Sequence, residues 1–122
     1  MTESSSRFEA LCLRYAQSLA SKRSALDDAW RAFVDEPLEP ARRELHEQVH
    51  RLVGSAPSYG YETIGRDARA VDACLRERED TPLASREDGA ELVARLAAPI
   101  RDLLQSLADG AEEASRRASG AD

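Results

Sequence analysis

Apolar residues recur at helical spacing along four stretches of this chain, separated by polar segments that contain proline or glycine. A spacing of three to four residues places apolar side chains on one face of an α-helix, so each stretch predicts an amphipathic helix. Short connections place successive helices antiparallel and side by side. The sequence therefore predicts an all-α fold, an antiparallel up-and-down four-helix bundle. The expected core comprises Leu19, Trp30, Leu45, Val49, Leu52, Ile64, Val71, Leu75, Leu96, Ile100 and Leu103.

Charged residues and prolines set the expected limits of the first two helices. The first apolar stripe comprises Phe8, Leu11, Cys12, Tyr15, Leu19, Leu26, Trp30 and Phe33. Lys22 and Arg23 interrupt this stripe, so the N-terminal helix is either continuous or split in two. The second helix is expected from about Pro40 to Ala56, because Pro57 disfavours the α conformation of the residue before it.

The remaining two helices have apolar stripes of their own. The third stripe comprises Ile64, Ala68, Val71 and Leu75, and the fourth Leu92, Leu96, Ile100, Leu103 and Leu107. Ser85 and Asp88 have the spacing of a capping box at the start of the last helix. Gly110 is expected to end that helix, because glycine is the residue most often found just after a helix.

The length of 122 residues is that of one domain with a core of its own. Hydrophobic residues make up 42% and charged residues 33% of the chain, which is typical of a soluble helical bundle. Residues 7–109 are expected to form the bundle, and residues 1–6 a short flexible lead. Residues 110–122 are small, polar and charged, and are expected to form a disordered tail.

The net negative charge of the chain excludes some classes of partner and indicates where the protein is located. A formal net charge of −6 argues against nucleic acid and against an anionic membrane surface, because both require a basic face. No apolar run approaches the length that spans a bilayer, so no membrane insertion is expected. Cys12 and Cys74 are isolated in the sequence and are expected to be buried thiols. These features indicate a cytoplasmic protein.

The segment 46–50 reads His-Glu-x-x-His, which is the helical signature of zinc peptidases. It supplies two imidazoles one turn apart, with Glu47 between them as a candidate general base. A catalytic zinc also needs a third protein ligand. Glu62, Asp67 or Asp72 are candidates only because acidic residues are frequent here. The extended metzincin pattern has a glycine where this chain has Val53, and no metal site is expected.

His50 and Gly54 form a second pattern on the same helix. His50 follows the core residue Val49, so it is expected at the edge of the buried stripe, with Gly54 one turn further along. A glycine inside a helix costs about 1 kcal/mol relative to alanine. Either another helix packs closely at Gly54, or a partner molecule approaches the backbone beside His50.

The segment from His50 to Gly60 closely resembles the phosphorylation site of histidine phosphotransfer (HPt) domains. It reads His50-x-Leu52-x-Gly54-Ser55-Ala56, and Gly60 follows before the third helix. The resemblance covers about residues 7–108. It implies a four-helix bundle in which His50 accepts a phosphoryl group, Leu52 points inward and Gly54 gives access. It also implies that Ser55 continues the motif and that Gly60 is the turn glycine.

One position departs from the family pattern. HPt domains commonly have a lysine three residues after the histidine, and this chain has Val53 there. The phosphate charge would then be supported by arginines of the third helix, for which Arg66, Arg69 and Arg76 are the candidates. Asp72 is expected at the edge of the same helix. A carboxylate there would fix the tautomer of His50 by accepting a hydrogen bond from one ring nitrogen.

The resemblance also implies the partners. The phosphoryl donor would be an aspartyl phosphate on a receiver domain, so the chain would be a monomeric carrier between the receiver domain of a hybrid sensor kinase and that of a response regulator. It would need no cofactor, because the receiver would supply Mg²⁺, and it would have no kinase activity. The alternatives are a phosphorylation-independent helical adaptor of the same fold and a small zinc peptidase.

Overall fold

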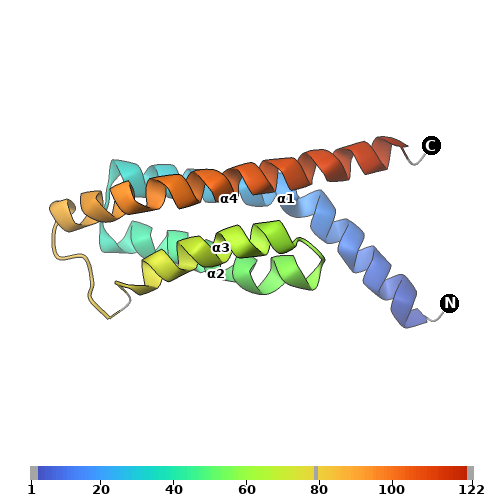
Figure 1. The fold of residues 1–122 in the computed structure, drawn as a ribbon, viewed down its shortest axis with the longest axis horizontal. Helices are drawn as coiled ribbons and strands as arrows, with labels where there is room; N and C mark the ends of the chain where they lie inside the picture. The colour runs from blue at the N-terminus through green and yellow to red at the C-terminus, as the bar shows by residue number, and fades with distance from the viewer. Residues whose placement is uncertain (1–2, 79, 121–122) are drawn as a thin grey trace.

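The computed structural model describes residues 3–78 and 80–120, which form four α-helices and no strand. The helices are α1 (Glu3–Asp35), α2 (Glu39–Ser58), α3 (Glu62–Arg76) and α4 (Arg86–Gly120). Successive helices run in opposite directions (Figure 1). α1 packs against α2 and α4, and α3 packs against the same two helices. The predicted antiparallel four-helix bundle is confirmed.

The core lies along the axis of the bundle and contains nearly all of the residues that the apolar stripes predict. The buried apolar residues are Tyr15, Leu19, Leu26, Ala29, Phe33, Leu45, Val49, Leu52, Ala56, Ile64, Ala68, Val71, Leu75, Leu92, Leu96, Ile100, Leu103 and Leu107. Trp30 differs from the prediction because it is only partly buried. Its ring packs beside the fully buried Phe33, with 6.5 Å between the ring centroids.

The N-terminal helix is continuous, although Lys22 and Arg23 interrupt its apolar stripe. The Lys22 ammonium group donates a hydrogen bond to Ser18 Oγ at 2.7 Å and lies 4.8 Å from the centroid of the Tyr15 ring. The long side chain therefore covers an aromatic surface while its charge remains hydrated. A lysine at this position interrupts the apolar pattern without breaking the helix.

The first turns of α1 differ from the prediction. Residues 3–6 are helical, whereas a flexible lead was expected, and Phe8 and Leu11 are 52% and 42% exposed although they belong to the apolar stripe. The first turns of α1 extend past the connection between α2 and α3 (Figure 1). No part of α2 or α3 therefore covers these turns, and their apolar side chains stay exposed. The apolar pattern predicts a helix correctly here, but the predicted burial is wrong.

The last helix also differs, because α4 continues through Gly110 to Gly120. The expected helix end at Gly110 and the expected disorder of residues 110–120 are therefore wrong for the part that the structure describes. A Cβ atom on Gly110 would lie 3.2 Å from both Leu19 and Ile64, so this glycine serves close packing between helices. Beyond it, ion pairs at i, i+4 spacing stabilise the exposed helix. They join Glu112 to Arg116 and Glu113 to Arg117.

The turn between α2 and α3 shows why Pro57 does not end its helix. α2 runs to Ser58, with Pro57 inside its last turn. The proline ring lies against α3, where a Cβ atom on Gly65 would be 2.5 Å from Pro57 Cγ. Packing of the ring on this glycine compensates for the backbone hydrogen bond that proline cannot donate. Gly60 then turns the chain with a φ of +88°, a conformation that favours glycine.

The predicted capping box at the start of α4 is present in a modified form. Ser85 Oγ accepts a hydrogen bond from the Asp88 backbone N–H at 3.2 Å. The Asp88 carboxylate accepts from the N–H of Ala84, one residue earlier than the usual partner, also at 3.2 Å. Both bonds satisfy backbone donors that would otherwise have no partner at a helix N-terminus.

Candidate functional site

One exposed face of α2 gathers polar side chains beside the C-terminal half of α3. His50 lies seven residues after Arg43 and four before Gly54, so the three share one line along the helix. A surface hollow of about 400 Å³ lies at this face. It is lined by Arg42, Arg43, His46, Glu47, His50 and Arg76. Three guanidinium groups, from α2 and α3, therefore border the same hollow as the His50 imidazole.

The buried carboxylate of Asp72 links the two helices. Its side chain is 8% exposed, and Oδ1 lies 2.9 Å from His46 Nε2 while Oδ2 lies 2.8 Å from Arg76 Nε. Burial of a charge is costly unless partners compensate for the lost water. The imidazole and the guanidinium provide this compensation, and they fix the carboxylate from both of its oxygens.

The two histidines occupy different environments. The His46 side chain is 17% exposed, and its Nε2 must carry a hydrogen to donate to Asp72. The His50 side chain is 64% exposed, and its Nδ1 lies 3.7 Å from the same Oδ1 atom. That distance exceeds a hydrogen bond. The Nε2 atom of His50, on the other edge of the ring, has no hydrogen-bond partner among the described residues.

The helix surface at Gly54, one turn on the C-terminal side of His50, is open. A Cβ atom built on Gly54 would have no described atom within 4 Å, apart from its chain neighbours and its own helical backbone. Gly54 therefore does not serve close packing between helices. Val53 packs partly buried against the core, so the position where HPt domains commonly have lysine contributes no charge.

Three other residues of the sequence motif have defined places in the bundle. Leu52 is buried in the core, and Gly60 forms the turn before α3. Ser55 Oγ lies 2.8 Å from the hydroxyl oxygen of Tyr15, which links α2 to α1. Burial raises the pKa of Tyr15, so this hydroxyl group stays protonated at neutral pH.

The arginines proposed from the sequence separate into two groups. Arg76 lines the hollow beside His50. Arg69 does not line it; its guanidinium lies near Gly65, with Nη1 3.7 Å from the position of a Cβ atom there. Arg66 faces Asp67 at 3.6 Å. Sequence reasoning missed Arg43, although its spacing of seven residues from His50 marks two helical turns on one face.

The geometry gives the zinc-peptidase interpretation little support. In the ranges 3–78 and 80–120, no three or more His, Cys, Asp and Glu side chains are grouped so that they could hold a metal ion. Glu47, the candidate general base of that interpretation, lies 3.3 Å from Arg51. Among the described residues, the His-Glu-x-x-His pair therefore belongs to no group of three ligands, whereas a catalytic zinc requires three protein ligands.

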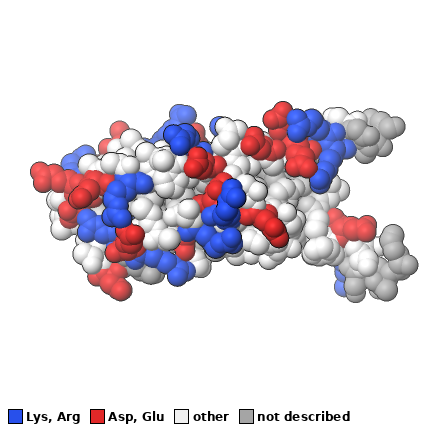
Figure 2. All heavy atoms as spheres, viewed as in Figure 1, with Lys and Arg blue, Asp and Glu red and all other residues white. Residues whose placement is uncertain are grey.

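Charges of both signs are mixed on the face of the molecule that Figure 2 shows. On the face in Figure 2, Lys and Arg side chains are interspersed with Asp and Glu side chains, without a continuous basic area on that face. Among the described residues, no helix combines the length and the apolar character needed to cross a bilayer.

A second hollow of about 600 Å³ lies between α1 and α4, away from the histidines. Trp30 and Leu104 form apolar parts of its lining, and Arg23 and Arg101 are among its charged residues. No histidine, cysteine or serine lines it. It is larger than the hollow beside His50 but has no comparable nucleophile.

Comparisons of the chain with protein-family models, with curated proteins and with solved structures gave no match. The likeness to HPt domains is therefore carried by the residues of this chain, chiefly His50, Gly54 and Gly60. In the structure these residues lie on α2 and at the turn that follows it.

Proposed function

We propose that this protein is a histidine phosphotransfer protein that carries a phosphoryl group on His50 between aspartates of receiver domains. The observation that supports this most is the environment of His50. Its imidazole is 64% exposed on a bundle helix, with Nδ1 3.7 Å from the fixed carboxylate of Asp72 and Nε2 on the opposite edge of the ring. Gly54 leaves open space one turn away, through which a partner could reach the ring.

The transfer step follows from this orientation. The lone pair of His50 Nε2 attacks phosphorus and forms an N–P bond. The P–O bond to the donor aspartate breaks, and its electron pair leaves with the aspartate carboxylate. Positive charge that develops on the ring is shared with Nδ1–H, which faces Asp72 Oδ1 at 3.7 Å. A shift of a few tenths of an ångström would complete that hydrogen bond.

The carrier needs few catalytic groups for such a transfer, because phosphoryl transfer depends mainly on positioning and on stabilisation of charge. Mg²⁺ and the acidic pocket belong to the receiver domain, so the carrier needs no cofactor. The partners we propose are a receiver domain of a hybrid sensor kinase and one of a response regulator, with a monomeric cytoplasmic carrier between them. No glycine-rich phosphate-binding loop occurs in the sequence, which agrees with a carrier that has no kinase activity.

One observation favours a second function, a helical adaptor that binds its partner without phosphorylation. Val53 supplies no cation at the position where HPt domains commonly have lysine. An adaptor would use the same open surface beside Gly54 but would have no need for the orientation of His50. The two functions differ in whether His50 is chemically modified.

The experiment that separates them is labelling of the protein by a phosphorylated receiver domain. We expect His50→Gln to abolish labelling, because glutamine has no nucleophilic ring nitrogen. The matched variant His46→Gln should keep most of it, because the amide still donates to Asp72. Labelling absent from the wild-type protein, with receiver binding intact, would favour the adaptor. Equal loss in both variants would contradict the role of His50.

A further inference from the structure

Two arginines lie on the N-terminal side of His50 and form what we call the basic edge, Arg43 and Arg76. Arg43 precedes His50 by seven residues, roughly 10 Å along α2. Its guanidinium group is turned toward Glu39, one turn nearer the N-terminus, and it lines the same hollow as His50. Arg76 and His50 both approach Asp72, at 2.8 Å and 3.7 Å. Both guanidinium groups therefore border the space into which a phosphoryl group on His50 would project.

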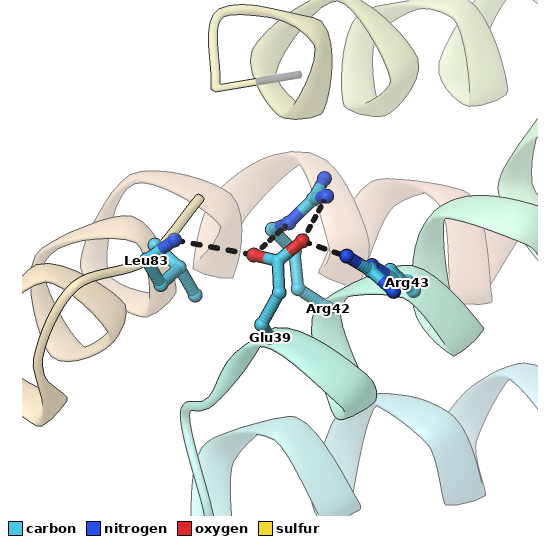
Figure 3. A network of polar contacts seen from close by, with 4 residues as sticks. All are labelled: Glu39, Arg42, Arg43 and Leu83. Carbon is cyan, nitrogen blue, oxygen red and sulfur yellow. Dashed lines mark hydrogen bonds and ion pairs between the residues drawn. The ribbon is translucent and has the colours of Figure 1, made fainter. Parts of the chain in front are cut away.

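The carboxylate of Glu39 holds Arg43 in this position, as Figure 3 shows. Oε2 of Glu39 accepts hydrogen bonds from Arg43 Nε at 3.2 Å and from Arg42 Nη2 at 2.5 Å. Oε1 accepts from Arg42 Nε at 2.8 Å and from the backbone N–H of Leu83 at 3.2 Å. One carboxylate at the start of α2 thus orders two arginines and the segment that enters α4.

The carboxylate of Glu39 is ionised at physiological pH. The hydrogen bond from Arg42 contributes most to lowering the pKa of Glu39, which falls to about 2 from its usual 4.5. The Leu83 N–H and Arg43 lower it further, while burial opposes them. Glu39 is therefore ionised wherever a phosphorelay operates, and Arg43 keeps its partner.

The charges around the hollow leave a small positive excess. Three guanidinium groups line the hollow (Arg42, Arg43 and Arg76), and a fourth, Arg51, lies outside the lining beside Glu47. These four lie among three carboxylates (Glu39, Glu47 and Asp72). Glu47 opposes an anion at this place, although Arg51 lies 3.3 Å from it. Individual exposed pairs contribute modestly, so removal of one arginine should weaken anion binding a fewfold and not abolish it.

We propose that Glu39 is a positioning residue that fixes Arg43, so that Arg43 and Arg76 hold the phosphoryl group on the N-terminal side of His50. This side is opposite to position 53, where HPt domains commonly have lysine. The inference rests on the proposed function and refines it, because it states which residues replace the missing lysine and from which side they act.

Titration with inorganic phosphate, followed by NMR signals of the His50 ring, tests this inference. Arg43→Ala and Glu39→Gln should each weaken phosphate binding about three- to fivefold, and Glu47→Gln should strengthen it about twofold. Arg31→Ala is the matched control, because Arg31 is also exposed and paired at i, i+4 spacing but lies on α1. It should leave phosphate binding unchanged.

A positioning role of Glu39 predicts a result in the double variant that a purely structural role does not predict. In the Arg43→Ala background, Glu39→Gln should weaken phosphate binding little more, because the two changes remove the same contact. Wild-type affinity in Arg43→Ala, which is exposed and should fold, would overturn the inference. So would an undiminished effect of Glu39→Gln in that background.

Treatment of the same samples with phosphoramidate distinguishes this inference from the proposed function. Phosphate binding that depends on Arg43, without any phosphoryl group appearing on His50, would support the basic edge and refute phosphotransfer. Phosphorylation of His50 at equal rates in the wild type and in Arg43→Ala would support phosphotransfer and overturn the basic edge.

Discussion

The surface of α2 has a different character on the two sides of His50. The N-terminal side holds the basic edge, ordered by hydrogen bonds through Glu39 and Asp72. The C-terminal side holds Val53 and Gly54, which are uncharged, and open space surrounds the glycine. On the proposed function, the N-terminal side would stabilise the phosphoryl anion and the C-terminal side would admit the partner. Each of the following changes alters one of these sides.

Loss of the charge at Glu39 should have the largest effect, on the free energy of unfolding. Glu39→Gln removes the carboxylate from Arg42, which is only 5% exposed, and should destabilise the protein by about 3 kcal/mol at pH 7. The measurement is urea denaturation followed by circular dichroism. An unchanged midpoint at pH 7 would show that the network does not stabilise the bundle.

The pH dependence of this effect has a definite sign. Because the pKa of Glu39 is lowered to about 2 from 4.5, its contribution to stability is complete above pH 4.5. That contribution is lost as the pH falls from 4.5 toward 2. The difference between wild type and Glu39→Gln should therefore shrink across this range. A difference that stays constant would contradict the lowered pKa.

Filling the open side should block the partner without unfolding the protein. Gly54→Leu places a large side chain into free solvent space, so the variant should fold and stay helical. Phosphoryl transfer from a receiver domain should slow by roughly 30-fold, a loss of about 2 kcal/mol in docking. Phosphorylation by phosphoramidate, which needs no docking surface, is the control and should change little. Normal transfer from a receiver would remove the access role of Gly54.

Removal of the carboxylate between α2 and α3 should have an intermediate effect. Asp72→Ala leaves no acceptor for Nδ1–H of His50 and frees His46 and Arg76. Transfer should slow about tenfold, the low end for loss of a carboxylate that orients a histidine in metal sites. His46→Leu should reproduce part of this loss and His46→Gln little of it. Wild-type rates in Asp72→Ala would exclude an orienting role.

The smallest expected effect is a gain in stability. Gly54→Ala adds a methyl group where the described structure has open space, and alanine has the higher helix propensity. The variant should be more stable by up to about 1 kcal/mol, with transfer from a receiver nearly unchanged. Destabilisation would mean that the glycine has a packing role after all.

The apolar pattern predicts the fold and the position of His50 well, because both depend on local periodicity. Val49, Leu52 and Ala56 are buried on α2, so His50 must emerge at the edge of that stripe. Helix ends are predicted less well. Pro57 and Gly110 lie inside helices because contacts with other helices, at Gly65 and at Leu19 and Ile64, outweigh their low propensity.

The charged side of the site shows another limit of sequence reasoning. Asp72 and Arg76 were expected near His50 from their place on the third helix, and both lie there. Arg43 was missed although its spacing of seven residues from His50 is a local pattern. Glu39 was missed because the hydrogen bond from Leu83 to Glu39 joins residues 44 positions apart. No local pattern encodes that contact. The closer approach of His46 than of His50 to Asp72 likewise depends on how α2 and α3 pack.

The most direct test of the central claim is the identification of the phosphorylated atom after treatment with phosphoramidate. Phosphorus NMR and peptide mass analysis of the wild-type protein should show one phosphoryl group, labile in acid, on Nε2 of His50. The His50→Gln variant should show none. A phosphoryl group on His46, or its absence from the folded wild-type protein under conditions that label a control HPt domain, would contradict the claim.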